Sequence, residues 1–337
     1  LDGSFRWQGG VRADPEAPFF LASVTKLYIA AATLRLAEAE RLSLDQPISA
    51  WLPPALIRGL HRWRGRDYTA SITVRHLLAH SSGLPDSLEE RPAGGRSLLE
   101  TVFEEGDRAW TLEEAVALAR DRLKPHFPPQ PPGSPRARVR YSDTNYQLLM
   151  LIIEAAAGRP LGSVYEEFFW QPLGLRETRL PDQAGRPALP LYAGGRVLER
   201  PLPLASSRDL IAPAAEAAAF LRALLTGQAF ARPATAALMQ GPWRRFGFPL
   251  DRAALRSPSW PIEYGLGMMR FRLPRWLTPA GPVPELAGHS GSTGSWLFYC
   301  PELGLIFAGT VDEAGSGAVP FQHLPRLLRT LQQAPFR

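Results

Sequence analysis

The sequence predicts an α+β protein in which strands from the two ends of the chain form an antiparallel sheet flanked by helices, while the middle of the chain forms a helical lobe. Short segments with strand character occur near both ends, and helical periodicity dominates between them. The composition is that of a globular protein, with 337 residues of which 45% are hydrophobic and 21% charged. We expect a single catalytic domain over residues 1–337, with a sheet lobe of about 1–22 plus 262–337 and a mostly helical lobe of about 23–261.

Apolar residues at helical spacing predict the helices of the middle lobe. The first of them has an almost wholly apolar face and should therefore be buried. Thr111 is a good N-cap, and the acidic residues that follow it favour a helix start. The predicted helices cover Ser23 to about Arg41, Thr73–His80, Thr111–Leu123, Thr144–Ala157, about Pro213–Leu225 and Phe321–Gln332.

The predicted strands lie near the two ends of the chain. Each is bounded by glycine or proline turn signals, such as Pro301 between the last two. They cover Phe5–Val11, Tyr264–Met268, Leu286–Ser290, Ser295–Cys300 and Leu303–Val311. The segment 125–135 is dense in proline, which predicts a stiff extended loop.

The composition also excludes several classes of protein. Cys300 is the only cysteine, so no internal disulfide and no cysteine-based zinc site can form. No stretch reaches the roughly 18 apolar residues of a membrane span. The chain begins at Leu1, so we expect a secreted or periplasmic protein if a signal peptide has been removed, and a cytoplasmic one otherwise.

The strongest chemical signal is Ser23-Val24-Thr25-Lys26, at the start of the first helix. Residues three apart share a helix face, so the Ser23 hydroxyl and the Lys26 amine can meet. Only two of the 38 basic residues are lysines, and a desolvated lysine, unlike arginine, can lose its proton. Such a lysine can deprotonate the serine, whose own N–H can stabilise an oxyanion. The alternative is an N-cap serine and a lysine whose stem covers the core.

A second signal is Tyr141-Ser142-Asp143, where the proline-rich loop enters a helix. A tyrosine near a positive group can act as a base or proton shuttle, and Asp143 can orient an amine or accept from a substrate amide. Alternatively, Tyr141 is a core aromatic and Asp143 caps the following helix.

A third signal is His289-Ser290-Gly291-Ser292, at the end of a predicted strand. Glycine in an edge strand lets another backbone approach closely, and the N–H of Ser292 can be a second oxyanion donor. A histidine beside a small hydroxyl suits carboxylate binding or proton relay. The alternative is an ordinary glycine-rich hairpin.

In this order, the three motifs resemble the serine β-lactamase and penicillin-binding-protein superfamily, which combines Ser-x-x-Lys with two later motifs. The similarity is closest to the class C-like branch, with its Tyr-x-Asn and Lys/His-Thr/Ser-Gly motifs, and that branch also contains DD-peptidases and esterases. It extends over about residues 5–330 and implies a β-lactamase/DD-peptidase-like fold. Further matching segments are Phe20–Lys26, Arg75–Pro85, Pro172–Leu175 and Tyr264–Gly267.

The resemblance implies a role for each matching residue. Ser23 would be the acylated nucleophile and Lys26 its proton partner, while Tyr141 would be the base or leaving-group acid. His289 would replace the usual lysine. The remaining predicted residues bind substrate, with Gly291 allowing close approach and the N–H groups of Ser23 and Ser292 forming the oxyanion hole. These substrate-binding residues are Asp143, Ser290, Gly291 and Ser292.

Two departures from the family pattern bear on activity. Asp143 stands where the branch usually has Asn, so it should favour the charged form of Lys26 and weaken that amine as a base. His289 in place of Lys gives a weaker, pH-dependent anchor for an anionic substrate. Both argue against efficient β-lactam hydrolysis.

Other candidate sites are weaker. His76 and His80 are four residues apart, but no glutamate follows His76, so we expect no metal site and no cofactor. The net charge is +6, yet the arginine-rich segments 62–66 and 136–140 lack an interleaved aromatic platform. These arginines favour a solvated surface over a nucleic-acid site.

We therefore predict a serine hydrolase that acts through an acyl-enzyme on a small-molecule or short-peptide acyl substrate. D-Amino-acid peptides, esters and, weakly, β-lactams are the expected substrates. The alternative is a non-catalytic, penicillin-binding-like sensor or binding module that uses the same cleft.

Overall fold

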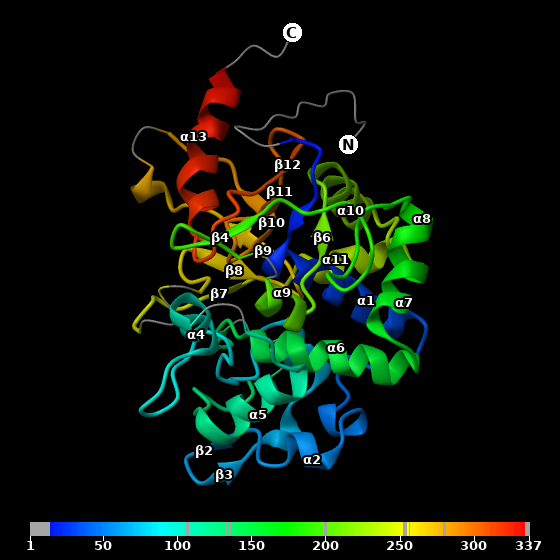
Figure 1. Ribbon diagram of the computed structural model, residues 1–337, viewed down its shortest axis with the longest axis vertical. Helices are drawn as coiled ribbons and strands as arrows, with labels where there is room; N and C mark the ends of the chain where they lie inside the picture. The colour runs from blue at the N-terminus through cyan, green and yellow to red at the C-terminus, as the bar shows by residue number, and fades with distance from the viewer. Residues whose placement is uncertain are drawn as a thin grey trace.

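The computed structural model describes residues 14–105, 108–131, 134, 136–198, 201–251, 255, 257–278 and 281–333. The strand predicted at Phe5–Val11 lies outside these residues. The chain folds into the α+β arrangement predicted from the sequence, with a sheet in one half of the molecule and mostly helices in the other (Figure 1).

Among the described residues, six antiparallel strands form the main sheet, in the order β12-β11-β10-β9-β8-β7. Their bounds are β7 Arg244–Arg245, β8 Ile262–Tyr264, β9 Met269–Phe271, β10 Leu286–Ser290, β11 Trp296–Cys300 and β12 Leu305–Gly309. The prediction for Leu286–Ser290 is confirmed, but β10 is an interior strand rather than an edge. Three two-stranded sheets join β1 Phe19–Phe20 to β6 Ile211–Ala212, β2 Arg62–Trp63 to β3 Arg66–Asp67, and β4 Leu191–Ala193 to β5 Arg196–Leu198.

The helices predicted from apolar spacing are present, with shorter ones between them. They are α1 Lys26–Glu38, α2 Pro54–Ile57, α3 Val74–Leu78, α4 Leu98–Glu105, α5 Leu112–Arg122, α6 Asp143–Ala157, α7 Leu161–Tyr165, α8 Gln171–Leu173, α9 Leu202–Ser206, α10 Ala214–Thr226, α11 Ala236–Met239 and α13 Val319–Gln333. The expected N-cap of α5 is confirmed, because Thr111 and Glu114 form a reciprocal capping box.

The sheet is covered on both faces, as the alternation along β11 shows. Leu297 packs into the larger core with α1 and α10, whereas Phe298 and Cys300 pack into a second core with Leu324 and Leu328 of α13. In Figure 1, α13 and α10 lie at opposite sides of the strands. The sheet half therefore includes α10 and β7, which the sequence assigned to the helical lobe.

The helix α1 lies at the centre of the larger core, because ten of its thirteen residues are buried. It packs against α6, which is similarly buried, and its Tyr28 ring stacks on Phe220 of α10 with ring centroids 3.4 Å apart. The burial predicted for the first helix is thus confirmed. This packing holds the start of α1 against both the sheet and α6, where the candidate site lies.

The strand predicted over Tyr264–Met268 is wrong, because residues 265–268 form the turn between β8 and β9. Gly267 has a φ of +88°, and a Cβ there would lie 2.1 Å from the Cβ of Ala30 in α1. The glycine therefore permits both the turn and its contact with α1.

No single helix in the described ranges is long and apolar enough to cross a membrane. The helix α6 and the segment Leu161–Leu173 reach that length and composition together, but they bend by 76°, and most of α6 is buried in the protein core.

Candidate active site

The chain enters the site through a single turn of 3-10 helix, Ala22–Thr25, which continues into α1. Ala22 has a φ of +45°, a backbone conformation that is uncommon outside glycine and that occurs at functional sites. Ser23 follows directly. Because the first N–H groups of a helix have no partner within the helix, the N–H of Ser23 is available to a ligand.

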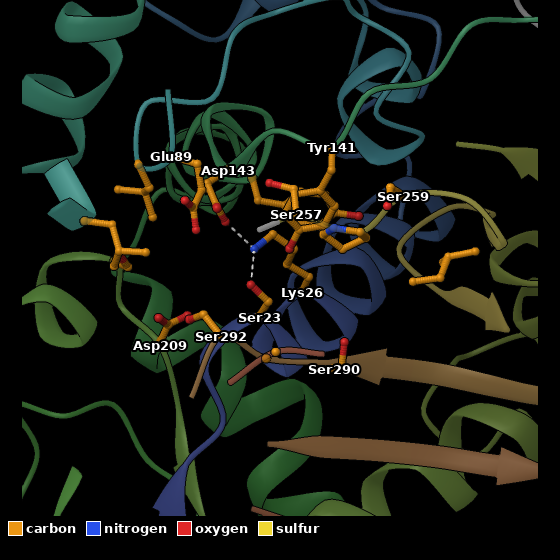
Figure 2. Close-up of a pocket in the computed structure, with 18 of the residues that line it drawn as sticks. Ser23, Lys26, Glu89, Tyr141, Asp143, Asp209, Ser257, Ser259, Ser290 and Ser292 are labelled. Carbon is orange, nitrogen blue, oxygen red and sulfur yellow. Dashed lines mark hydrogen bonds and ion pairs between the residues drawn. The ribbon is translucent and has the colours of Figure 1, made fainter. Parts of the chain in front are cut away.

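Ser23 and Lys26 meet as the sequence predicts. The Lys26 amine donates to the Ser23 hydroxyl over 2.9 Å and forms an ion pair with Asp143 (Figure 2). Only 4% of Lys26 is exposed. Burial alone would lower the pKa of this amine, but the charge of Asp143, with contributions from Tyr141 and Asp209, raises that pKa above its ordinary value. The amine is therefore charged at neutral pH in the free protein.

Tyr141 and Asp143 reach the same place from the start of α6. Ser142 precedes the helix, and its hydroxyl donates to the carbonyl of Pro85 over 2.8 Å. The Tyr141 ring centroid lies 5.1 Å from the Lys26 amine. Burial raises the pKa of the Tyr141 phenol well above its ordinary value, although Lys26 and Ser23 oppose the shift. The phenol is therefore protonated at neutral pH and can donate a proton.

A buried histidine fixes the segment that carries Tyr141. Nδ1 of His80 accepts from the N–H of Ser142 over 3.2 Å and lies 3.0 Å from the Asn145 amide nitrogen. Its ring lies against Tyr141, with centroids 4.5 Å apart. Burial lowers the pKa of His80 well below its ordinary value, so the imidazole is neutral with its proton on Nε2.

His80 and His76 do not face a common ligand site. The ring nitrogens of His76 lie 2.9 Å from the Thr73 hydroxyl and 2.6 Å from the carbonyl of Gln130. Within the ranges that the structure describes, no group of three or more His, Cys, Asp and Glu side chains is arranged to hold a metal ion.

The end of β10 brings Ser290, Gly291 and Ser292 to the pocket that contains Ser23. Hydrogen bonds join this segment to Phe20 and Leu21, which precede the turn that carries Ser23. The Ser295 hydroxyl donates to the carbonyl of Leu21 over 2.7 Å, and the Thr293 hydroxyl donates to that of Phe20 over 3.2 Å. Both hydroxyls are buried. The position of Ser292 relative to Ser23 is thus fixed by side chains that the sequence analysis did not select.

Gly291 is needed for this close approach. A Cβ there would lie 2.2 Å from the Ser295 hydroxyl oxygen, 2.7 Å from the carbonyl oxygen of Leu21 and 2.9 Å from the Cβ of Ala22. The space that the missing side chain leaves is therefore filled by the chain itself, whereas the sequence analysis expected it to accommodate substrate.

His289 lies behind the pocket rather than in its lining. It is fully buried, and Nδ1 donates to the carbonyl of Ser290 over 2.7 Å while Nε2 lies 3.2 Å from the Tyr264 hydroxyl. Burial, with Lys26 contributing in the same direction, lowers the pKa of His289 to about 3. A neutral imidazole outside the lining differs from the substrate anchor expected from the sequence.

The pocket itself has a volume of about 280 Å³ and is largely apolar away from Ser23. Its apolar lining comes from α4, α6, α9, β9, α13 and the loops between elements, and includes Leu88, Leu99, Trp110, Met150, Leu204, Trp260, Phe271 and Phe321. Two carboxylates that the sequence analysis missed, Glu89 and Asp209, also line it (Figure 2). Neither belongs to a motif, so only the fold could identify them.

Comparison with known proteins shows which fold and which family this chain has. A crystal structure of a D-stereospecific amidohydrolase from Streptomyces sp. superposes with a TM-score of 0.69 at 27% identity, over 94% of this chain and 88% of that one. The fold is that of the β-lactamase and DD-peptidase class of proteins. The chain belongs to the Beta-lactamase family, whose model matches residues 3–330.

Curated relatives match a shorter region. The D-alanyl-D-alanine-carboxypeptidase/endopeptidase AmpH of Escherichia coli (strain K12) is 27% identical over 188 residues, which are 55% of this chain and 43% of that protein. Esterase EstB of Burkholderia gladioli is 31% identical over 166 residues, which are 47% and 37% of the two chains. The chain thus matches less than half the length of these relatives.

Proposed function

We propose that this protein hydrolyses small acyl compounds through an acyl-enzyme on Ser23. D-Amino-acid peptides and carboxylic esters are the proposed substrates, with β-lactams as poor ones. The observation that carries the proposal is the hydrogen bond from a buried lysine to a serine at the opening of a helix, inside a pocket. The names of the amidohydrolase, carboxypeptidase and esterase relatives support the same chemistry.

In the proposed acylation, Ser23 Oγ attacks the substrate carbonyl while its proton passes to Lys26, which must be neutral at that moment. The carbonyl oxygen becomes an oxyanion and accepts from the N–H groups of Ser23 and Ser292. As the bond to the leaving group breaks, the proton passes from Lys26 through the Tyr141 hydroxyl to the leaving group.

In the proposed deacylation, a water molecule attacks the acyl-enzyme and gives a proton to Lys26 by the same route. The bond between Ser23 Oγ and the acyl carbon breaks, and Ser23 recovers a proton. One water is consumed in each cycle, and the enzyme returns to its starting state. His80 and His289 do not exchange protons in this scheme, since both are neutral and lie behind the pocket.

The test is a comparison of the wild-type protein with Ser23→Ala. A labelled penicillin, a fluorophosphonate and an activated ester should each add their acyl or phosphonyl mass to the wild type and not to the variant. Ser163→Ala, an exposed position on α7, is the matched control and should behave as the wild type. Turnover that survives in Ser23→Ala would contradict the proposal.

A rate panel then separates the candidate substrates. We would compare p-nitrophenyl esters, a D-Ala-D-Ala peptide and a chromogenic cephalosporin at equal enzyme concentration. Hydrolysis of the esters or the peptide, with slow turnover or simple acylation by the cephalosporin, is the expected result.

A further inference from the structure

The pocket differs in charge from the chain that surrounds it. The protein has a net charge of +6, and all but two of its 38 basic residues are arginines. Among the described residues that line the pocket, however, there is no arginine, and the basic residue is Lys26. Three carboxylates, those of Glu89, Asp143 and Asp209, line the same space.

The charge of Lys26 is already matched. Its amine is paired with Asp143, so that pair contributes little net charge to the pocket. When Asp209 is ionised, its carboxylate is therefore negative charge in excess of the pair. In Figure 2, the labels of Asp209 and Ser292 lie on one side of the Ser23–Lys26 pair, and those of Asp143 and Glu89 lie on the other.

Backbone hydrogen bonds fix Asp209 relative to the nucleophile. The next residue, Leu210, donates its N–H to the Thr25 hydroxyl over 2.9 Å and accepts from the N–H of Leu21 over 2.8 Å. Leu21 precedes the turn Ala22–Thr25, and Thr25 is the last residue of that turn. Asp209 thus directly precedes a residue that is hydrogen-bonded to both ends of the segment that contains Ser23, and both Asp209 and Ser23 line the pocket.

The Asp209 carboxylate makes no hydrogen bond or ion pair with another described residue in this structure. Burial raises its pKa to about 7, Lys26 opposes the shift, and Asp143 adds to it. The titratable side chains around it in the pocket lining are Lys26, Glu89, Tyr141, Asp143 and Tyr146. A cation placed against Asp209 would stabilise its charged form, whereas a carboxylate placed there would be repelled.

We propose that Asp209 selects substrates whose acyl part carries a protonated amine, and that it does so by accepting a charge-assisted hydrogen bond from that ammonium group. The proposed substrate class is the amino-acyl ester or amide with a free amine and an apolar side chain, since Leu88, Trp110 and Met150 are among the apolar residues that line the pocket. Substrates with a carboxylate on the acyl part are disfavoured. This inference rests on the proposed acyl-enzyme chemistry at Ser23 and goes beyond it.

The test uses four thiobenzyl esters whose acyl parts are small and carry a positive, no or a negative charge, with release of thiol followed by absorbance. These are the alanine ester in both D and L forms, the isobutyric ester, in which a methyl group replaces the ammonium, and the anionic succinic monoester. The wild type should prefer one alanine enantiomer to the isobutyric ester and should use the succinic ester least.

The variant Asp209→Asn keeps the size of the side chain and removes its charge. We expect the ratio of kcat/KM for the alanine ester to that for the isobutyric ester to fall by about 10- to 100-fold, as for the loss of a charged hydrogen bond. Asp209→Ser is a second neutral variant in case the first does not fold. Asp182→Asn, exposed and outside the pocket lining, should keep the wild-type ratio.

The outcomes separate this inference from the proposed function. If Ser23→Ala abolishes turnover of the isobutyric ester but the ratio in Asp209→Asn equals that of the wild type, only the role of Asp209 is overturned. A preference of the wild type for the succinic ester over the alanine ester would also overturn the proposed role of Asp209. If Ser23→Ala keeps the full rate with every ester, the acyl-enzyme proposal itself fails.

Discussion

Asp143 holds Lys26 in the protonated form, and replacing it by asparagine tests whether that ion pair limits catalysis. Asp143→Asn keeps an amide oxygen in place of the carboxylate oxygen that accepts from Lys26, but removes the negative charge. Without that charge, burial acts on the amine with less opposition and lowers its pKa. The neutral amine that accepts the Ser23 proton is then present at lower pH.

The size of the effect follows from the charge pair. The two side chains are 5% and 17% exposed, so solvent screens them little. Two unit charges about 4 Å apart interact by about 4 kcal/mol at the effective dielectric constant usual for proteins, which corresponds to roughly 3 pKa units. We therefore expect the acid limb of kcat/KM against pH to move down by about 3 units. At a pH well below both limbs, the variant should be faster by up to about a thousandfold.

The assay is the initial rate of p-nitrophenyl ester hydrolysis from pH 5 to pH 10, corrected for spontaneous hydrolysis. The wild type should still gain rate in the alkaline range, because its Lys26 pKa is raised. Asp121→Asn is the matched control, since it removes a carboxylate from an exposed ion pair with Arg120 outside the pocket lining. Its profile should overlay that of the wild type.

An acid limb that stays in place or moves to higher pH in Asp143→Asn would refute the reasoning. A variant that is slower than the wild type at every pH would also refute it, since Asp143 would then contribute to catalysis by more than its effect on the Lys26 pKa.

Three further predictions concern the groups that hold the site together. Gly291→Ala places a carbon 2.7 Å from the Leu21 carbonyl oxygen, so we expect a stability loss of about 1–3 kcal/mol and at least a tenfold lower acylation rate, and a wild-type Tm and rate would contradict this. Ser295→Ala removes the side-chain donor to the same carbonyl, so the free energy of unfolding measured in urea should fall by about 1 kcal/mol and acylation of Ser23 should be slower. Acylation at the wild-type rate would show that this hydrogen bond does not position Ser23. His289 stays neutral in the folded state down to a pKa of about 3 but protonates near pH 6.5 when unfolded, so its contribution to stability is complete above about pH 6.5 and is lost as the pH falls toward 3. Between pH 6 and pH 4, the free energy of unfolding measured in urea should therefore fall by about 1.4 kcal/mol per pH unit more in the wild type than in His289→Gln. Parallel curves of unfolding free energy against pH would show that the imidazole is not kept neutral.

The Ser23–Lys26 pair could be predicted from the sequence because helical spacing alone brings residues three apart to one face. The three C-terminal strands could be predicted because each has a turn signal at its boundary, such as Pro301. The pairing of β1 with β6 could not be predicted, since two-residue strands show no periodicity and the paired residues are some 190 positions apart in the sequence.

The direction in which the side chains at the end of β10 point could not be predicted from the sequence either. Neighbouring residues of a strand point to opposite faces, so His289 and Ser290 cannot both face the pocket. In the structure Ser290 lines the pocket, whereas His289 lies beside the Tyr264 hydroxyl. Asp209 was missed for a related reason, because it is positioned by the hydrogen bonds of Leu210 rather than by any motif.

The hydrogen bonds from Thr293 and Ser295 to the turn before Ser23 have a consequence for substrate entry. They join the hairpin after β10 to the residues that lead into α1, so this hairpin cannot move away from them without breaking these bonds beside Ser23. Opening of the molecule between this hairpin and the start of α1 is therefore incompatible with the proposed site. Entry and product exit must instead depend on the loops that border the pocket, which can change in length and sequence without disturbing the reactive groups.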